Sequence, residues 1–190
     1  VTEILMVNRK HLDITHPKLK ELIAPDFLKV ENFSNSLQGY DACFFCAGIS
    51  SVGMKEEKYT VITYDTTVHF AKTLVAINPG MVFNYITGAH TDSTEKGKLM
   101  WARVKGKTEN DLMKLPFRGQ YNFRPGAMSP AKGQKNAKLL YVLLVNIITV
   151  FSSKYIISLN ELGQAMINAA VQGYPKQILE ISDIKALAKT

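Results

Sequence analysis

Runs of apolar residues alternate with amphipathic stretches along the whole chain, and the two patterns predict strands and helices in turn. Short β-branched or aromatic runs between turn residues predict strands at 3–8, 27–31, 41–46, 81–87 and 177–181. Apolar positions at helical spacing predict helices at 17–24, 55–77, 99–109, 159–171 and 182–188, with a further apolar helix from 138. This alternation indicates an α/β fold: a doubly wound parallel sheet with helices on both faces, in one domain spanning 1–190.

The most informative part of the pattern is the strand predicted at 81–87 together with the polar segment and helix after it. The strand is mostly β-branched and aromatic, which is typical of a strand buried on both faces of a parallel sheet. A polar tip, residues 88–93, separates it from a stretch of helix formers. In that helix Trp101, Lys105 and Glu109 are spaced four residues apart and share one face. Ligands of open α/β sheets bind at the carboxyl ends of strands, so we expect the chemistry here.

Thr87 followed by Trp101-x-x-x-Lys105 resembles the Ser/Thr…Tyr-x-x-x-Lys active site of the short-chain dehydrogenase/reductases. It is most similar to their atypical, NAD(P)-binding branch, which has a Rossmann fold and is related to the extended epimerases and dehydratases. The resemblance implies that Thr87 hydrogen-bonds a substrate carbonyl and that Lys105 bridges the nicotinamide ribose hydroxyls. Trp101 stands at the position of the catalytic tyrosine. Because an indole N–H only donates, it cannot exchange a proton as a phenol does.

A second segment, residues 120–126, looks like the sixth strand and the Arg-Pro-Gly turn of the extended enzymes. The resemblance places Pro125 against the nicotinamide. The match is specific in combination, because this turn comes ~20 residues after the lysine helix, the length of a helix plus a loop in a βαβ unit.

Two further segments resemble the parts of the family that contact the adenosine half of the cofactor. Cys46-Ala47-Gly48 resembles the Ala-Gly turn after the fourth strand, where a glycine lets the backbone approach a ribose or diphosphate. Asn32 and Phe33 follow the strand predicted at 27–31. They stand where the family usually has an acidic residue and an apolar one beside the adenine.

The first predicted strand ends at Asn8 and is followed by Arg9 and Lys10. In a nucleotide-binding sheet the end of the second strand meets the adenosine ribose, and basic residues there accommodate a 2′-phosphate. If this is that strand, Asn8, Arg9 and Lys10 contact the cofactor, and NADP is favoured over NAD. A solvated loop after a strand is the alternative interpretation.

The resemblance begins at the family's second strand. The first strand, its Gly-rich phosphate loop and the first helix have no counterpart in the sequence. That strand is normally central in a 3-2-1-4-5-6 sheet, so its absence leaves two neighbouring strands without a partner. We therefore expect that a preceding segment of ~30 residues, the size of a strand-loop-helix unit, belongs to the fold.

Composition limits the remaining classes. The 190 residues carry a net charge of +7, which suits a phosphate-bearing ligand. The lysines are scattered and form no nucleic-acid module, so we do not expect nucleic acid. Cys43 and Cys46 lie in a strand pattern and point to opposite faces, which favours buried free thiols over a metal site and suits a reducing, cytoplasmic location. The apolar stretch 139–151 is too short to span a bilayer.

These observations predict an NAD(P)-binding oxidoreductase-like protein acting on an unknown small molecule, as a monomer or homodimer. The replacement of the catalytic tyrosine by Trp101 favours one alternative, a non-catalytic NADP-binding sensor or regulator. Turnover would require another proton donor, and Tyr85 and His90 are the candidates at the same strand end. A nucleotide-sugar epimerase or dehydratase ranks last, since only ~65 residues follow Arg124, about half a separate domain.

Overall fold

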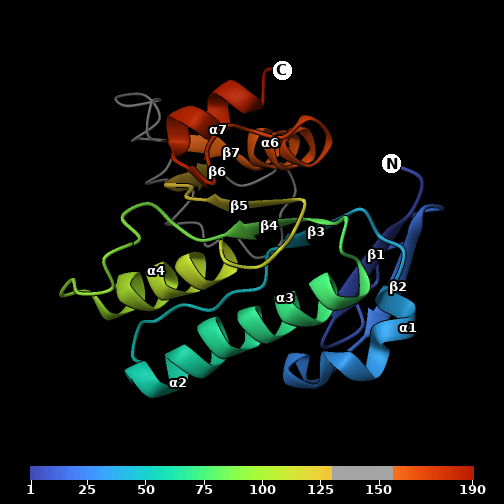
Figure 1. Ribbon diagram of the computed structural model, residues 1–190, viewed down its shortest axis with the longest axis horizontal. Helices are drawn as coiled ribbons and strands as arrows, with labels where there is room; N and C mark the ends of the chain where they lie inside the picture. Colours follow the sequence, from blue (N-terminus) through green and yellow to red (C-terminus); the bar gives the residue numbers. More distant parts are fainter. Residues whose placement is uncertain (130–155) are drawn as a thin grey trace.

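The computed structural model describes residues 1–129 and 156–190, in which parallel strands alternate with helices (Figure 1). In chain order the elements are β1 (Ile4–Asn8), β2 (Leu19–Ile23), η1 (Phe27–Phe33), α1 (Ser34–Leu37), β3 (Ala42–Phe45), α2 (Glu56–Thr60), η2 (Val61–Asp65), α3 (Thr66–Ile77), β4 (Val82–Ile86), α4 (Met100–Leu112), β5 (Gly119–Phe123), β6 (Ala127–Ser129), β7 (Ile156–Ser158), α6 (Leu159–Gln172), β8 (Ile178–Leu179) and α7 (Ile181–Leu187). The apolar helix predicted from 138 lies outside the described residues.

The main sheet has four parallel strands in the order β3-β4-β5-β8, and β1-β2 and β6-β7 form two further parallel pairs. Helices α2, α3 and α4 lie on one side of the main sheet and α6 and α7 on the other (Figure 1). This arrangement confirms the predicted α/β class, a doubly wound parallel sheet with helices on both faces. Among the described residues, no helix is both long and apolar enough to cross a bilayer.

Strand β4 separates two apolar cores, as its β-branched and aromatic run predicted. Phe83 and Tyr85 point to one face and Val82 to the other, where Asn84 donates to the carbonyl oxygen of Met166 at 2.8 Å. We call the first the α3-side core: Val30, Leu37, Phe45, Phe70, Ala71, Leu74, Met81, Phe83, Tyr85 and Leu112. The second is the α6-side core: Val82, Tyr121, Phe123, Ile157, Leu162, Ala165, Met166, Ala169, Leu179, Ile184 and Leu187.

The β1-β2 pair is a separate sheet in the described structure. Within residues 1–129 and 156–190, strand β1 pairs only with β2, and β3 pairs only with β4. The pair still belongs to the same body, because Leu5, Val7 and Leu22 pack against the α3-side core. The break in the sheet therefore falls between β1 and β3.

Two predicted elements are wrong. Residues 17–24, predicted as a helix, contain β2, because parallel pairing of Leu19 to Ile23 with β1 outweighs their mixed helix propensity. Residues 27–31, predicted as a strand, lie in the 3₁₀ helix η1. The carboxylate of Asp26 accepts from the N–H of Leu28 and starts that helix. The alternation that suggested a strand is the three-residue spacing of apolar side chains on a 3₁₀ helix.

The C-terminal elements follow the predicted pattern. Ser158 caps α6 through a reciprocal capping box with Glu161, and the helix ends at Gln172, before Gly173 at φ +75°. The final strand and helix are present as β8 and α7. Their role in the fold is to complete the sheet edge beside β5 and to cover the α6-side core.

Candidate functional site

The candidate site lies where β4 and β5 end. Backbone pairing continues past both strands: the N–H of Thr87 donates to Phe123 at 2.8 Å, and that of Ala89 donates to Pro125 at 2.9 Å. The polar tip after β4 is therefore held against the turn that follows β5. This contact brings Thr87 and Pro125, which lie far apart in the sequence, to one place.

The hydroxyl of Thr87 is engaged inside the tip. Its Oγ1 lies 2.7 Å from Oγ1 of Thr91, whose own proton goes to the carbonyl oxygen of Gly88 at 2.7 Å. Thr87 therefore donates to Thr91, and it accepts from the N–H of Gly88. A substrate carbonyl receives the Thr87 proton only by displacing Thr91.

Lys105 reaches the same strand end from α4. Its Nζ donates to the backbone carbonyl oxygen of Thr87 at 2.8 Å. Burial lowers the pKa of Lys105, and the negative charge of Glu109 one turn along the helix partly opposes this. Within the described residues this is the one acceptor of the ammonium group, so two of its three N–H bonds are available to a ligand.

Helix α4 approaches the tip closely at Gly106. A β-carbon at this position would lie 1.8 Å from the carbonyl oxygen of Asp92 and 3.2 Å from the nitrogen of Ser93. The N–H of Asp92 also donates to the carbonyl oxygen of Ala102 at 3.1 Å. Only glycine permits this contact, which sets how far Lys105 projects toward β4.

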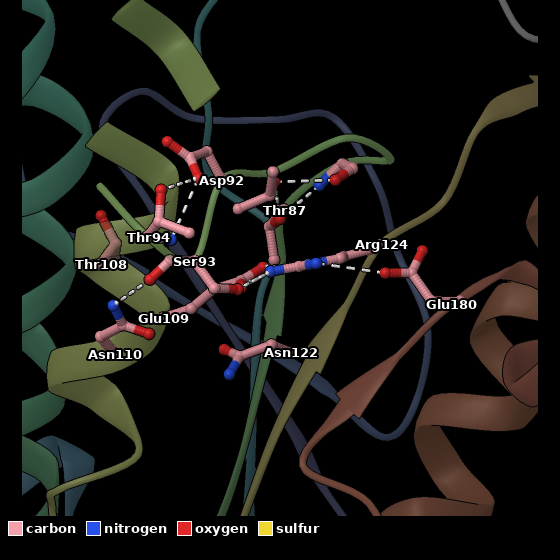
Figure 2. Close-up of polar contacts among 12 residues, drawn as sticks. Thr87, Asp92, Ser93, Thr94, Thr108, Glu109, Asn110, Asn122, Arg124 and Glu180 are labelled. Carbon is pink, nitrogen blue, oxygen red and sulfur yellow. Dashed lines mark hydrogen bonds and ion pairs between the residues drawn. The ribbon is translucent and has the colours of Figure 1, made fainter. Parts of the chain in front are cut away.

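A buried ion pair joins α4 to the turn after β5 (Figure 2). Glu109 is fully buried and accepts two hydrogen bonds from the guanidinium of Arg124, one of them from Nε at 3.0 Å. The guanidinium also donates to Ser93 at 2.6 Å and to Glu180 at 3.1 Å. Burial alone would lower the pKa of Arg124, but the hydrogen bonds and negative charges of Glu109 and Glu180 together outweigh it and raise that pKa. The side chain of Arg124 thus holds together α4, the tip after β4, the turn after β5 and the segment after β8.

A pocket of about 590 Å³ opens between these elements. Its described lining is Thr87, Gly88, Ala89, His90, Trp101, Pro125, Gly126, Ala127, Met128, Ile156 and Ile181. Three predicted site residues, Thr87, Trp101 and Pro125, share this lining, and Lys105 lies behind Gly88. The wall is mostly apolar, and a small number of polar groups converge on it, which is the usual build of a small-molecule site.

The predicted adenosine-side residues lie on other elements. Cys46, Ala47 and Gly48 follow β3 and are exposed, and Arg9 and Lys10 are exposed after β1. The expectation that Cys46 is buried is therefore wrong, because β3 ends at the preceding residue and the chain leaves the sheet. Both cysteines are free, as predicted.

Asn8 and the pair Asn32–Phe33 lie in different surroundings from those the resemblance implied. The side-chain amide of Asn8 donates to Glu21 of β2 at 2.9 Å, so its amide is tied to the neighbouring strand. Asn32 and Phe33 lie inside η1 rather than after a strand. Strand β2, which pairs with β1, is followed instead by Ala24, Pro25 and Asp26.

The sequence did not reveal the partner of Glu109. It placed Lys105 and Glu109 on one helix face, and the structure directs Lys105 to Thr87 and Glu109 to Arg124. One weak feature of the sequence pointed to such a partner. Glu109 shares a helix face with Lys105, and a carboxylate on a face directed at a sheet requires a cation.

No protein-family model matches the chain, whereas several solved structures share its fold. Glucuronic acid dehydrogenase from Chromohalobacter salexigens matches with a TM-score of 0.62 and 11% identity over 94% of this chain and 66% of its own. The dTDP-glucose 4,6-dehydratase DesIV from Streptomyces venezuelae, solved with NAD, matches with a TM-score of 0.66 and 13% identity, over 95% of this chain and 66% of its own. RMD from Pseudomonas aeruginosa, complexed with NADPH, matches with a TM-score of 0.57 and 13% identity, over 93% of this chain and 76% of its own.

At these identities the likeness establishes the fold alone, a Rossmann-like α/β fold. The chain spans slightly less than two thirds of the length of the dehydrogenase and dehydratase structures named above.

Proposed function

We propose that the protein is an NAD(P)-dependent oxidoreductase-like protein of the atypical short-chain dehydrogenase class. The observation that carries this is the convergence of Thr87, Trp101 and Pro125 on one pocket, with the ammonium of Lys105 directly behind it. Thr87 and Pro125 follow the carboxyl ends of the parallel strands β4 and β5, and α4 brings Trp101 and Lys105 to the same place, the usual location of ligands in such sheets.

The residues of the pocket fit the nicotinamide half of a dinucleotide. Lys105 has two free N–H bonds for the ribose hydroxyls, and Pro125 offers a flat, donor-free wall for the ring. When bound, the nicotinamide supplies hydride chemistry. The chain's own part is to bind and orient the ring and to exclude water from the apolar pocket.

The adenosine half is held by the ends of β1 and β3 in this proposal. Arg9 and Lys10 are exposed and, within the described residues, pair with no carboxylate, so both are free to meet a 2′-phosphate. This favours NADP, with NAD as the second candidate. Asn8 and the loop Cys46-Ala47-Gly48 complete the predicted contacts.

No described residue provides a Gly-rich diphosphate loop, and the broken sheet indicates where such a loop would lie. We propose that a strand-loop-helix unit occupies the gap between β1 and β3. A strand in that gap would hydrogen-bond to β1 on one side and to β3 on the other and so join the two sheets. It would supply the partners that the backbone N–H and C=O groups of both edges need when they are buried. Its loop would open at the same sheet end as the pocket.

The side-chain exposure supports the helix of that unit as well. Because Leu5 and Leu22 face the α3-side core, their neighbours Ile4 and Ile23 face the opposite side, and they are 48% and 38% exposed. Phe44 of β3 points the same way and is 44% exposed. A right-handed crossover into β1 places its helix over this face, since the helices between β3 and β4 cover the other.

The intact mass of the protein purified from its source tests the additional unit. We expect a value ~3 kDa above the 21.2 kDa of this chain, the mass of ~30 residues. A mass of 21.2 kDa would contradict a covalently attached unit and would leave the diphosphate without a loop.

Calorimetric titration with NADPH and NADH tests the cofactor. We expect NADPH to bind more tightly, and Lys105→Met to weaken both by tenfold or more, because a hydrogen bond to a charged group contributes ~1.5–3 kcal/mol. Lys72→Met, an exposed lysine of α3, is the matched control and should bind as the wild type does. Equal binding by the two variants would refute the role of Lys105.

The replacement of the catalytic tyrosine favours a second candidate, a non-catalytic NADP-binding sensor. Trp101 lines the pocket, where an indole can pack against a ligand but cannot exchange a proton. NADPH binding without turnover, together with reductase activity gained by Trp101→Tyr, would support the sensor. An epimerase or dehydratase acting on nucleotide sugars is the third candidate, suggested by the dehydratase among the similar structures.

A further inference from the structure

We propose that His90 is the residue of this site that exchanges a proton with the oxygen of the substrate. The proposal rests on the oxidoreductase function above and deepens it. His90 lines the pocket together with Thr87, Trp101 and Pro125. His90 is exposed, and among the described lining residues it is the one imidazole, the side-chain type that most often serves as a general acid or base in enzymes.

The backbone holds His90 in a fixed and unusual conformation. Its φ is +66°, in the left-handed region that non-glycine residues rarely adopt. Hydrogen bonds anchor the residues on both sides: Ala89 donates to Pro125 at 2.9 Å, and the N–H of Thr91 donates to Gly88 at 3.2 Å. A conformation that costs free energy persists where its surroundings impose it, and such residues cluster at functional sites.

The other candidate named by the sequence, Tyr85, is excluded by its position. Its side chain is 1% exposed and lies in the α3-side core beside the ring of Phe45. Burial raises the pKa of its phenol further above the physiological range. Tyr85 therefore has no access to the pocket, and its phenol holds its proton too tightly to release it at neutral pH.

The remaining described tyrosines are also committed elsewhere. Tyr40, Tyr64 and Tyr174 donate to carboxylates outside the pocket. Tyr121 accepts from a backbone N–H in the α6-side core, and Tyr59 is 2% exposed. No described tyrosine replaces the phenol that Trp101 displaces.

The charged side chains of Lys105, Asp92 and Arg124, near the tip, are each held by partners other than His90. Lys105 donates to the backbone of Thr87, and Asp92 is hydrogen-bonded within its own turn. Arg124 is paired with Glu109 and Glu180 on adjoining elements. Within the described residues the imidazole of His90 has no side-chain partner, so its protonation is not tied to a structural contact.

The proton moves between His90 and the substrate oxygen in both directions of the reaction. In reduction, the N–H bond of the His90 imidazolium breaks and an O–H bond forms on the substrate. The carbonyl carbon gains its hydrogen and both electrons from the reduced dinucleotide of the proposed function. In oxidation, neutral His90 takes the hydroxyl proton. Such a general acid or base contributes a factor of about 10² to 10⁴ in rate.

Trp101 allows a test that does not depend on activity, because it is the single tryptophan of the chain. His90 and Trp101 line the same pocket, and a protonated imidazole quenches the fluorescence of a nearby indole, so we expect a pH-dependent step in the emission of the wild type. His90→Asn should abolish this step, since asparagine tolerates a left-handed backbone and does not titrate. His69→Gln, which removes a surface histidine paired with Glu31, is the matched control and should retain it.

Kinetics then test the proton transfer itself. With NADPH and 4-nitrobenzaldehyde as the carbonyl probe, His90→Asn should lower kcat by about 10²-fold or more and flatten its pH profile, with unchanged NADPH affinity. Unchanged kcat and pH profile in His90→Asn, or no fluorescence step in the wild type, would overturn the assignment. A wild type that binds NADPH without turnover would overturn it in favour of the sensor. Absence of NADPH binding would instead refute the proposed function and the assignment with it.

Discussion

The close contact between α4 and the tip makes Gly106→Ala the sharpest test of how the site is built. The added methyl group would lie 1.8 Å from the carbonyl oxygen of Asp92 and 2.5 Å from its carbonyl carbon. Both atoms are backbone, and the N–H of Asp92 is itself bonded to Ala102 of α4. No side-chain rotation relieves the overlap, so the helix and the tip must separate.

The cost of that separation depends on the contacts it breaks. Inserting a methyl into a packed interior costs typically ~1–3 kcal/mol, and we expect the upper end because the obstacle is rigid. The displacement also lengthens the bond from Lys105 to Thr87, now 2.8 Å, and strains the pair of Glu109 with Arg124. We therefore expect a loss of about 3 kcal/mol in the free energy of unfolding, and weaker NADPH binding.

Urea denaturation measures this loss, and Gly163 provides the matched control. Gly163 lies inside α6, and a β-carbon there meets no atom within 4 Å. Gly163→Ala should stabilise the protein by ~0.5–1 kcal/mol through helix propensity. A Gly106→Ala variant as stable as the wild type would refute the reasoning, since α4 would then have room to move without consequence.

Three further predictions concern the charges and thiols around this framework. Glu109→Gln should destabilise the fold by ~3–5 kcal/mol because it removes the buried carboxylate partner of Arg124 and leaves only the half-exposed Glu180 as counter-charge, whereas Glu109→Leu combined with Arg124→Met should recover much of the loss in urea denaturation. Burial opposes ionisation of Asp183, but the hydrogen bonds from Lys176, the backbone of Glu180 and Tyr174, together with the charge of Lys176, outweigh it and lower the pKa of that carboxyl. The stability that Asp183 contributes is therefore present above its unfolded pKa of ~3.9 and is lost as pH falls through the lower folded value. Asp183→Asn should accordingly flatten the acid side of a stability-against-pH curve; an unchanged curve would contradict it. Burial raises the thiol pKa of both cysteines. Cys46 is exposed and should still react with a thiol reagent in the native protein, whereas Cys43, which is less exposed, should react only on unfolding.

The sequence was most informative where burial is complete. The strand β4 and the helix α4 were predicted because a run of β-branched and aromatic residues and four-residue spacing leave few alternatives. Residues 17–24 and 27–31 were misassigned because short amphipathic stretches fit a helix and a strand about equally well. Pairing with β1 decided the first, and the cap at Asp26 decided the second.

The site could be predicted in part for a similar reason. Residues on one helix face, such as Trp101 and Lys105, are brought together by local spacing. The pair of Glu109 and Arg124, 15 residues apart, depends on how α4 packs against β5, which no local pattern encodes. The engagement of the Thr87 hydroxyl by Thr91 likewise depends on the turn of the tip rather than on residue type.

Energy transfer from Trp101 to bound NADPH tests the central claim, a reduced nicotinamide in the pocket at the ends of β4 and β5, most directly. Trp101 is the single tryptophan and lines that pocket, so its emission reports both binding and place. We predict that NADPH quenches Trp101 emission in a saturable way, with sensitised nicotinamide fluorescence, and that Lys105→Met shifts the curve to higher concentration. Binding detected by calorimetry without energy transfer, or no binding at all, would contradict the claim.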